Sequence, residues 1–199
     1  MLRKLTNMDY ECGCDEAGRG CLAGPVIAAA VVFPNEFFDS TIIDSKLLTK
    51  IKRNNLRELI NTNVLTAEIG FVDNQEIDEL NILNASFEAM HRAINKLSIE
   101  PDFIIVDGNR FKPYKNIPHE CIVKGDAKYI SIAAASILAK TYRDEYMQKI
   151  HKEYPMYHWD KNKGYPTKQH REAIREFGVS PYHRTSFRLF DEQLSLDLE

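Results

Sequence analysis

The chain has 199 residues, of which 44% are hydrophobic and 28% charged, a composition that predicts one globular domain and excludes a disordered or fibrous protein. The longest apolar stretch, residues 22–33, is too short to span a membrane, and no hydrophobic signal region follows the first residues, so we expect a cytoplasmic protein. The formal net charge is −3, yet residues 108–188 hold 16 basic and 8 acidic residues, whereas residues 1–107 hold 10 and 17. This asymmetry fits a phosphate-binding surface beside an acidic site, or an ordinary solvated surface.

Strand and helix patterns predict a layered α/β or α+β domain of about five strands and at least four helices. In chain order, the strands are expected over residues 10–15, 26–33, 64–72, 103–107 and 120–123. The helices are expected from Thr49, a good N-cap, and over residues 84–97, 129–154 and 167–177. The first helix carries apolar residues at helical spacing, namely Ile51, Leu56, Leu59 and Ile60.

Three of the four cysteines, Cys12, Cys14 and Cys21, crowd around a glycine-rich segment, whereas Cys121 stands apart. A structural zinc site requires a second pair of ligands, which is missing, and Cys12 and Cys14 alternate along an expected strand. We therefore predict free, partly buried thiols in a reducing compartment.

Four carboxylates stand where strands end or helices begin: Asp15, Glu16, Asp107 and Asp126. Taken singly, each has an ordinary explanation, such as a surface turn or a helix N-cap. Taken together, they are expected to converge at one edge of the sheet, where they would repel one another unless a cation lay between them. Carboxylates suit Mg²⁺ or Mn²⁺, and two such ions about 4 Å apart can catalyse phosphodiester cleavage.

The turn Gly18-Arg19-Gly20 follows the first two acids. Glycines allow the main chain to approach a sugar without an intervening side chain. The 2′-hydroxyl is the group that distinguishes RNA from DNA, so this turn is suited to recognising a ribose beside the acidic site.

Eight segments, in order and over nearly the whole chain, resemble the motifs of the ribonuclease HII family. They are residues 14–20 (Cys-Asp-Glu-Ala-Gly-Arg-Gly), 22–26 (Leu-Ala-Gly-Pro-Val), 44–46 (Asp-Ser-Lys), 106–108 (Val-Asp-Gly), 124–126 (Lys-Gly-Asp), 132–140 (Ile-Ala-Ala-Ala-Ser-Ile-Leu-Ala-Lys), 164–167 (Gly-Tyr-Pro-Thr) and 183–187 (His-Arg-Thr-Ser-Phe). The resemblance implies a ribonuclease H-like mixed five-stranded sheet flanked by helices. We expect one catalytic domain over residues 1–190, including a small helical extension at about 155–190, and a mobile acidic tail at 191–199.

The resemblance also implies the activity. The family hydrolyses the RNA strand of RNA–DNA hybrids and nicks duplex DNA 5′ of single ribonucleotides, leaving 3′-hydroxyl and 5′-phosphate ends, as in ribonucleotide excision repair. It uses two Mg²⁺ or Mn²⁺ ions. The residues that match its metal-binding catalytic acids are Asp15, Glu16, Asp107 and Asp126. The residues that match or suit substrate binding are Gly18, Arg19, Gly20, Lys46, Tyr165 and Arg184, of which Lys46 and Arg184 are candidate phosphate contacts.

Asp144 is a rival for the fourth acid, because it lies in the same helical block as Asp126. An unbroken helix from about residue 129 would place Asp144 roughly 22 Å along the axis, at 1.5 Å per residue. We therefore predict that Asp144 pairs with Lys140, one turn back, and stays outside the metal site.

Two alternative functions remain open on the sequence. One is another acidic-site nuclease on the same fold, such as a DNA exonuclease, integrase or junction resolvase, which would cut all-DNA duplex. The other is a binding module without catalysis, which the presence of all four acids disfavours. We expect a monomer.

The terminus, from Gln193 to Leu198, resembles the short Gln-Leu-x-Leu motifs that dock bacterial replication proteins on the sliding clamp. Alternating leucines on a mobile tail can fill a hydrophobic groove. The alternative is an amphipathic end that packs on its own domain, which we favour because such motifs are short.

Overall fold

The computed structural model describes residues 3–43, 45 and 48–190. A five-stranded sheet with the order β3-β2-β1-β4-β5 forms its centre. The strands are β1 (Glu11–Ala17), β2 (Val26–Val32), β3 (Thr66–Val72), β4 (Phe103–Asp107) and β5 (His119–Ile122). Strand β2 runs antiparallel to both β1 and β3, whereas β1, β4 and β5 are parallel. The predicted mixed five-stranded sheet is thus confirmed.

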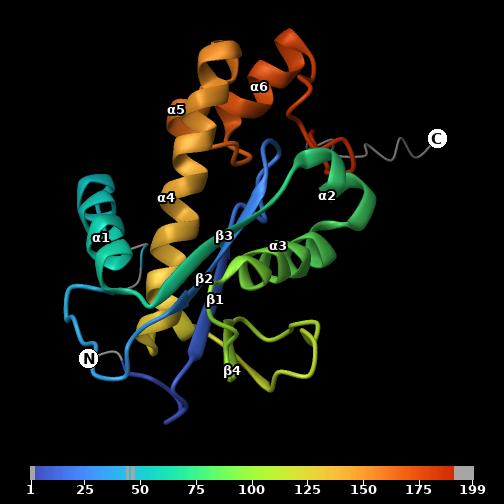
Figure 1. Cartoon of the computed structure of the whole chain (residues 1–199). Coiled ribbons are helices and arrows are strands. Elements are labelled where there is room, and N and C mark those ends of the chain that lie inside the picture. The colour runs from blue at the N-terminus through green and yellow to red at the C-terminus, as the bar shows by residue number, and fades with distance from the viewer. Residues whose placement is uncertain (1–2, 44, 46–47, 191–199) are drawn as a thin grey trace.

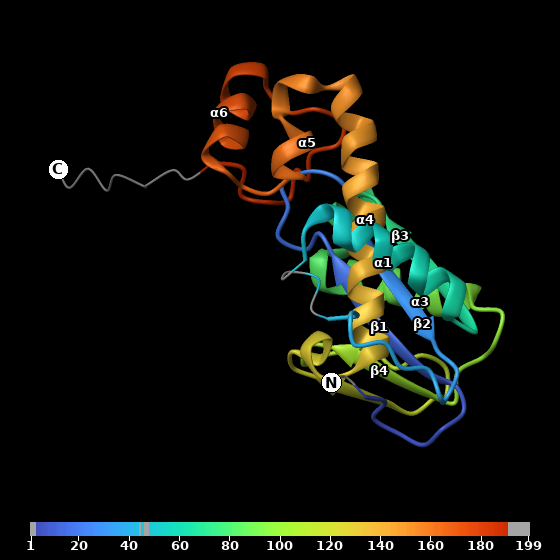
Figure 2. The same cartoon turned by 90° about the vertical axis from the view of Figure 1, so that its left-hand side faces the viewer.

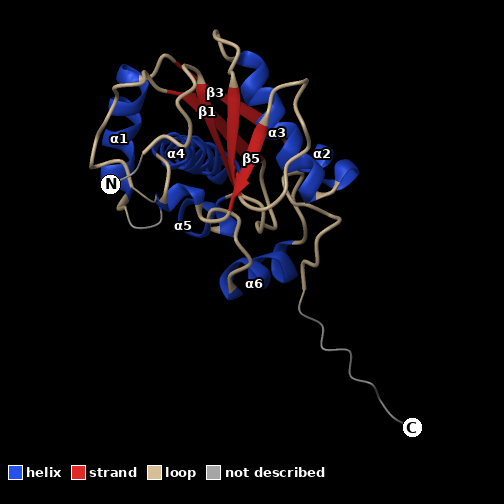
Figure 3. Ribbon diagram, turned by 90° about the horizontal axis from the view of Figure 1, so that it is seen from below, coloured by secondary structure: helices blue, strands red, loops and turns tan. Residues whose placement is uncertain are grey.

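Helices cover both faces of this sheet (Figure 3). The longer ones are α1 (Lys50–Asn63), α3 (Ile82–Lys96), α4 (Ile130–Glu153) and α6 (Lys168–Phe177), and the short ones are α2 (Asn74–Leu80) and α5 (Trp159–Asn162). Alternate residues of β2 explain the layering: Ala29 and Val31 pack with α1 and α4, whereas Ala28 and Ala30 pack with α3. A strand buried on both faces is nearly all apolar, as β2 is.

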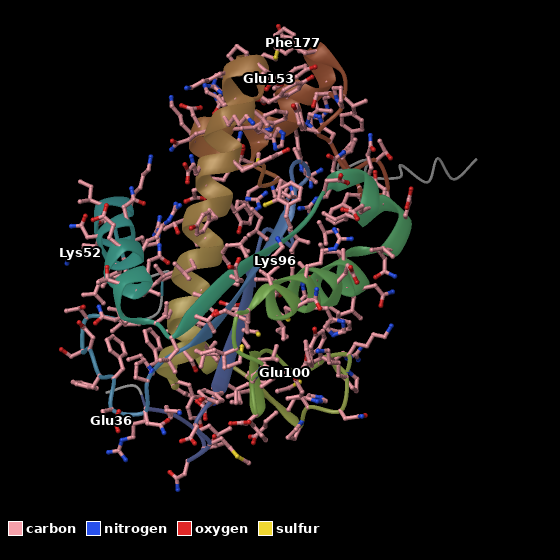
Figure 4. The ribbon with its side chains drawn as sticks, in the orientation of Figure 1. Glu36, Lys52, Lys96, Glu100, Glu153 and Phe177 are labelled. Atoms are coloured by element: carbon pink, nitrogen blue, oxygen red, sulfur yellow. The ribbon has the colours of Figure 1, made fainter. Side chains whose placement is uncertain are left out.

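Helix α4 runs the length of the molecule, from the sheet to the C-terminal extension (Figures 1 and 2). Its alanines 133, 134 and 135 are fully buried, and such small side chains allow the helix to pack closely on the sheet. The extension holds α5 and α6, and its core includes Trp159 and Ile174 together with Met147 and Ile150 of α4. Glu153 and Phe177 lie at this end, opposite Glu36 and Glu100 (Figure 4).

The structure differs from the sequence prediction at three places. Helix α2 was not predicted, although Asp73 caps it and Glu76 completes a capping box, a local signal present in the sequence. Helix α5 was also missed, because four residues carry no periodicity. Ile51 was expected on the buried face of α1 but is 74% exposed, because that helix buries only Leu56 and Ile60. Within the described ranges, none of the helices combines the length and hydropathy needed to cross a membrane.

Candidate active site

Three neighbouring parallel strands deliver three carboxylates to one edge of the sheet. Cys14 of β1 lies opposite Val106 of β4, so Asp15 and Asp107, one residue further on, lie side by side, Asp107 at the end of β4 and Asp15 two residues before the end of β1. Asp107 in turn lies opposite Ile122, the last residue of β5. The turn after β5 leads into the short 3₁₀ helix η2 (Gly125–Ala127), which contains the buried Asp126.

The side chains of Asp15, Asp107 and Asp126 come together, with one carboxylate oxygen from each lying within 4.8 Å of the others. The main-chain amide of Gly125 donates to Oδ1 of Asp107 at 2.7 Å, which ties the turn that carries Asp126 to the end of β4. Oxygen ligands at this spacing suit a hard divalent cation, so these three residues can hold a metal ion together.

The electrostatics of Asp15 also favour a cation. Burial raises the pKa of this carboxyl well above its usual value, and the negative charges of Glu16 and Asp107 raise it further. Hydrogen bonds from Ser136 on α4 and from the amide of Glu16, the latter at 2.7 Å, act in the opposite direction. A divalent ion would stabilise the ionised form that the surrounding protein disfavours.

Glu16, the fourth predicted ligand, is not part of this cluster. Neighbouring residues of a strand point to opposite faces, and Glu16 lies on the α3 side, where it lines a cleft with Ser86 and Met90. Its carboxylate accepts a hydrogen bond from Arg19 at 3.1 Å. Burial raises the pKa of Glu16, and the charge of Arg19 partly opposes that effect. As a metal ligand, Glu16 therefore remains a proposal.

The glycine turn and Tyr165 line the same cleft as the acids. This cleft, of about 280 Å³, is lined by Asp15, Asp107, residues 16–20 and Tyr165. Tyr165 is 41% exposed, and burial, together with the neighbouring Cys21, raises the pKa of its hydroxyl. The residues that sequence reasoning assigned to the acidic site and to the ribose are thus brought to one place.

The main chain of the turn needs glycine at one position and leaves room at the other. Gly18 has φ of +103°, and a Cβ there would lie 2.1 Å from Nε of Arg143. A Cβ at Gly20 would meet nothing within 4 Å. The first glycine is therefore required by the fold, whereas the second leaves open space beside the acids.

A family model for ribonuclease HII matches residues 12–190 of the chain. The chain belongs to the ribonuclease HII family. It is 63% identical over 185 residues to a ribonuclease HII of Christiangramia forsetii, and the match covers 93% of each chain. It is 57% identical over 199 residues to a ribonuclease HII of Phocaeicola vulgatus, and that match covers 100% of this chain and 99% of the relative. At this similarity the chain is an endoribonuclease, which confirms the predicted enzyme class.

Solved structures agree with this assignment of the fold. The ribonuclease H2 of Pyrococcus horikoshii is 27% identical with a TM-score of 0.76, covering 90% of this chain and 94% of that one. A ribonuclease HII of Archaeoglobus fulgidus, solved in a complex with PCNA, has a TM-score of 0.74 at 24% identity, covering 93% and 98%. A Bst ribonuclease HIII in complex with Mn²⁺ has a TM-score of 0.70 at 18% identity, covering 90% and 67%.

Arg184 of this ribonuclease HII chain was predicted to contact a phosphate, but the structure places its side chain elsewhere. Its side chain is fully buried. The guanidinium donates to the carbonyl oxygens of Gly18 and Arg19, at 2.8 and 2.9 Å, and twice to that of Gly24. With its donors directed at main-chain carbonyls, Arg184 holds the glycine turn instead of facing a phosphate.

The other predicted residues divide into three groups. Lys46 and the segment from Gln193 to Leu198 lie outside the described residues. Asp144 is absent from the acidic cluster and pairs with Lys140, and α4 runs unbroken between Ile130 and Glu153, as predicted. The four cysteines are free thiols, of which Cys12, Cys14 and Cys21 are fully buried, more deeply than predicted, and Cys121 is half-buried.

Two basic residues of the ribonuclease HII cleft were missed by sequence reasoning, namely Arg53 and Lys140. Lys140 closes the matched segment 132–140, so that motif could have indicated it. Arg53 comes from α1, where it donates to the carbonyls of Ser45 and Leu48. No spacing in the sequence links Arg53 to the acids, because their proximity depends on how α1 packs on α4.

Proposed function

We propose that this enzyme hydrolyses the RNA strand of RNA–DNA hybrids and nicks duplex DNA immediately 5′ of a single embedded ribonucleotide, leaving 3′-hydroxyl and 5′-phosphate ends. The observation that carries the proposal is the shared cleft, in which an acidic cluster lies beside a glycine turn and a half-exposed tyrosine. A metal-dependent nuclease without sugar selectivity would require only the acidic cluster. The adjacent glycine turn and the Tyr165 ring can account for selectivity for a ribose.

Asp15, Asp107 and Asp126 would hold the metal, and we propose Glu16 as a further ligand and Mg²⁺ or Mn²⁺, two ions, as the cofactor. Such ions activate water and stabilise the leaving oxygen of a phosphodiester. The Mn²⁺ complex of the related ribonuclease HIII supports this choice of ion. Glu16 lies between the two clefts that share Arg19 and Asp107, so rotation of its side chain away from Arg19 would bring its charge toward the cluster.

The chain's own residues would orient the substrate. The main chain at Gly20 has room for a ribose because no protein atom occupies the position of a side chain there. Tyr165 presents a ring that can stack on the sugar that follows the ribonucleotide, and a hydroxyl that can donate a hydrogen bond. Arg19, half of whose side chain is exposed, is a candidate substrate contact at the same edge.

A duplex of DNA with one ribonucleotide, incubated with Mg²⁺ or with chelator, tests the proposal. We expect one nick 5′ of the ribonucleotide with Mg²⁺ and none with chelator. An all-DNA duplex of the same sequence is the control. Cleavage of the all-DNA duplex at a comparable rate would favour an exonuclease or resolvase and overturn the proposal.

We also propose that the Gln193–Leu198 segment binds the sliding clamp, in place of the packed end that the sequence alone favoured. The support is the Gln-Leu-Ser-Leu-Asp-Leu sequence and the fact that a relative of the same fold was solved in complex with PCNA. Deletion of residues 193–199 should abolish binding to a bacterial clamp in a pull-down with purified proteins. Equal binding by the full and shortened chains, or none by either, would exclude this role.

A further inference from the structure

The C-terminal extension contains two buried histidines that the proposed catalysis does not use. His170 of α6 and His183 of the following loop are essentially inaccessible to solvent, as is Trp159 of α5. The two imidazole rings contact each other, with Nε2 of His170 lying 3.2 Å from Nε2 of His183. Two facing nitrogens form a hydrogen bond only when one ring donates and the other accepts.

The neighbours of the rings decide which one donates. The main-chain amide of Ser180 donates to Nδ1 of His183 at 2.8 Å, so that nitrogen carries no proton and the ring's proton lies on Nε2. The indole of Trp159, which can only donate, points at Nε2 of His170 at 3.0 Å, so that nitrogen accepts. The proton of His170 therefore lies on Nδ1.

The direction of the remaining bond follows. Nδ1 of His170 lies 2.9 Å from the carbonyl oxygen of Tyr165 and donates to it. A one-way chain of hydrogen bonds thus runs from Ser180 through His183 and His170 to the main chain of Tyr165. It requires both imidazoles to be neutral, because a proton on either acceptor nitrogen would break it.

The surroundings of the rings favour the neutral form. Tyr157 and Trp159 pack against both imidazoles, and the Ser180 hydroxyl lies 2.9 Å from Nδ1 of His183. The positive charge of Arg171 disfavours a second cation at His170. Burial is the main cause that lowers the pKa of both rings. None of the hydrogen-bond partners of either ring is a carboxylate.

Arg184, the residue after His183, contacts the glycine turn, which is the other element proposed to recognise the ribose. Arg184 follows His183 directly, and it holds the carbonyls of Gly18 and Arg19 as described above. One dipeptide is therefore bonded to the glycine turn on one side and, through His170, to Tyr165 on the other. The amide of Leu22, two residues after the turn, also donates at 2.7 Å to the carbonyl of Gly164, the residue before Tyr165, which joins the flanking main chains.

We propose that His183 and Arg184, with His170, are positioning residues that set Tyr165 relative to the glycine turn and so determine the preference for a ribose–deoxyribose junction. The proposal rests on the proposed function of Tyr165. Neutral His170 holds the main-chain carbonyl of Tyr165, and Arg184 holds the carbonyls of the glycine turn. A displacement between them would misalign the substrate and lower kcat more than it raises KM.

Two substitutions of His170 separate positioning from folding. In His170→Asn the amide nitrogen can replace Nδ1 as donor to Tyr165, whereas His170→Leu removes the donor. We expect His170→Leu to lower the ratio of kcat/KM on a single-ribonucleotide duplex to that on a uniform RNA–DNA hybrid by about tenfold, and His170→Asn to stay within about threefold of the unchanged protein. His91→Leu is the control, because its ring also bonds a main-chain carbonyl, that of Lys112, outside the cleft.

Nuclear magnetic resonance of the whole ¹⁵N,¹³C-labelled chain supplies the second readout. We expect the Nε2–H tautomer at His183, the Nδ1–H tautomer at His170, and Tyr165 ring shifts that move in His170→Leu but not in His170→Asn. Opposite tautomers, or ring shifts that move in neither or both variants, would overturn the proposal. Ring shifts as expected with an unchanged substrate ratio would refute the proposed role of Tyr165 while the positioning link stands.

Discussion

The two parts of the cleft are built in opposite ways. The acidic part consists of carboxylates that strand register forces together, and burial and mutual repulsion disfavour the charge of Asp15. The part that we propose recognises the ribose, called the ribose-reading part, consists of a turn and a tyrosine whose main-chain carbonyls are held by a buried arginine and a buried histidine. The comparison indicates that a cation would complete the first part, whereas hydrogen bonds within the protein already hold the main chain of the second.

Removal of one carboxylate should give the largest effect on activity. Asp107→Asn keeps the shape of the side chain but removes a charge from the cluster, so we expect cleavage to fall by more than about a hundredfold. Less repulsion should leave the metal-free protein at least as stable as the unchanged one. Nicking assays, hybrid-binding assays and thermal melts with and without Mg²⁺ measure these effects. Equal cleavage by both proteins would show that the site is wrong.

Arg184→Leu tests the opposite part and should act on stability as well as on selectivity. It removes the donor from the carbonyls of Gly24 and Arg19 and leaves that of Gly18 with the Cys21 amide alone, which we expect to lower the free energy of unfolding by about 3 kcal/mol. Burial lowers the pKa of Arg184 to about 10, so the group is charged at neutral pH. Arg184→Lys should not rescue it, because an ammonium lacks the planar fork. Urea denaturation measures the loss, and full rescue by lysine would contradict the positioning role.

A lower pH should reduce the stability that neutral His183 gives to the ribose-reading part. The pKa of His183 is lowered to about 4, chiefly by burial, from an ordinary value near 6.5. The unfolded chain therefore binds a proton at a higher pH than the folded one. The stabilisation by neutral His183 is complete above pH 6.5 and is lost as the pH falls toward 4, by on the order of 3 kcal/mol. Melts from pH 7.5 to 4 should show a flatter profile in His183→Asn, and parallel profiles would refute this linkage.

The two glycines of the turn should respond differently to alanine. Gly20→Ala meets no protein atom, so we expect an unchanged melting temperature but about tenfold weaker cleavage at a ribonucleotide, because the methyl group would occupy space for the sugar. Gly18→Ala must adopt φ of +103° against Arg143, so we expect a loss of stability of about 1 kcal/mol or more. A stable, fully active Gly20→Ala enzyme would remove the turn from ribose reading.

Much of the acidic part could be predicted from the sequence. The apolar run of β4 ends at Asp107, and that pattern alone indicated a carboxylate at the edge of the sheet. The rise of an α-helix was enough to separate Asp144 from Asp126. The position of Glu16 was also available, since alternation along β1 places it on the face opposite Asp15.

The ribose-reading part was decided by the tertiary structure. Local patterns determine which residues form strands and helices, and therefore where the acids end a strand. The partners of the Arg184 guanidinium are main-chain carbonyls, which every residue possesses, so neither residue type nor spacing indicates them. The contact of Arg184 with Gly18 spans 166 positions. It exists only because the C-terminal extension folds back on the loop between β1 and β2.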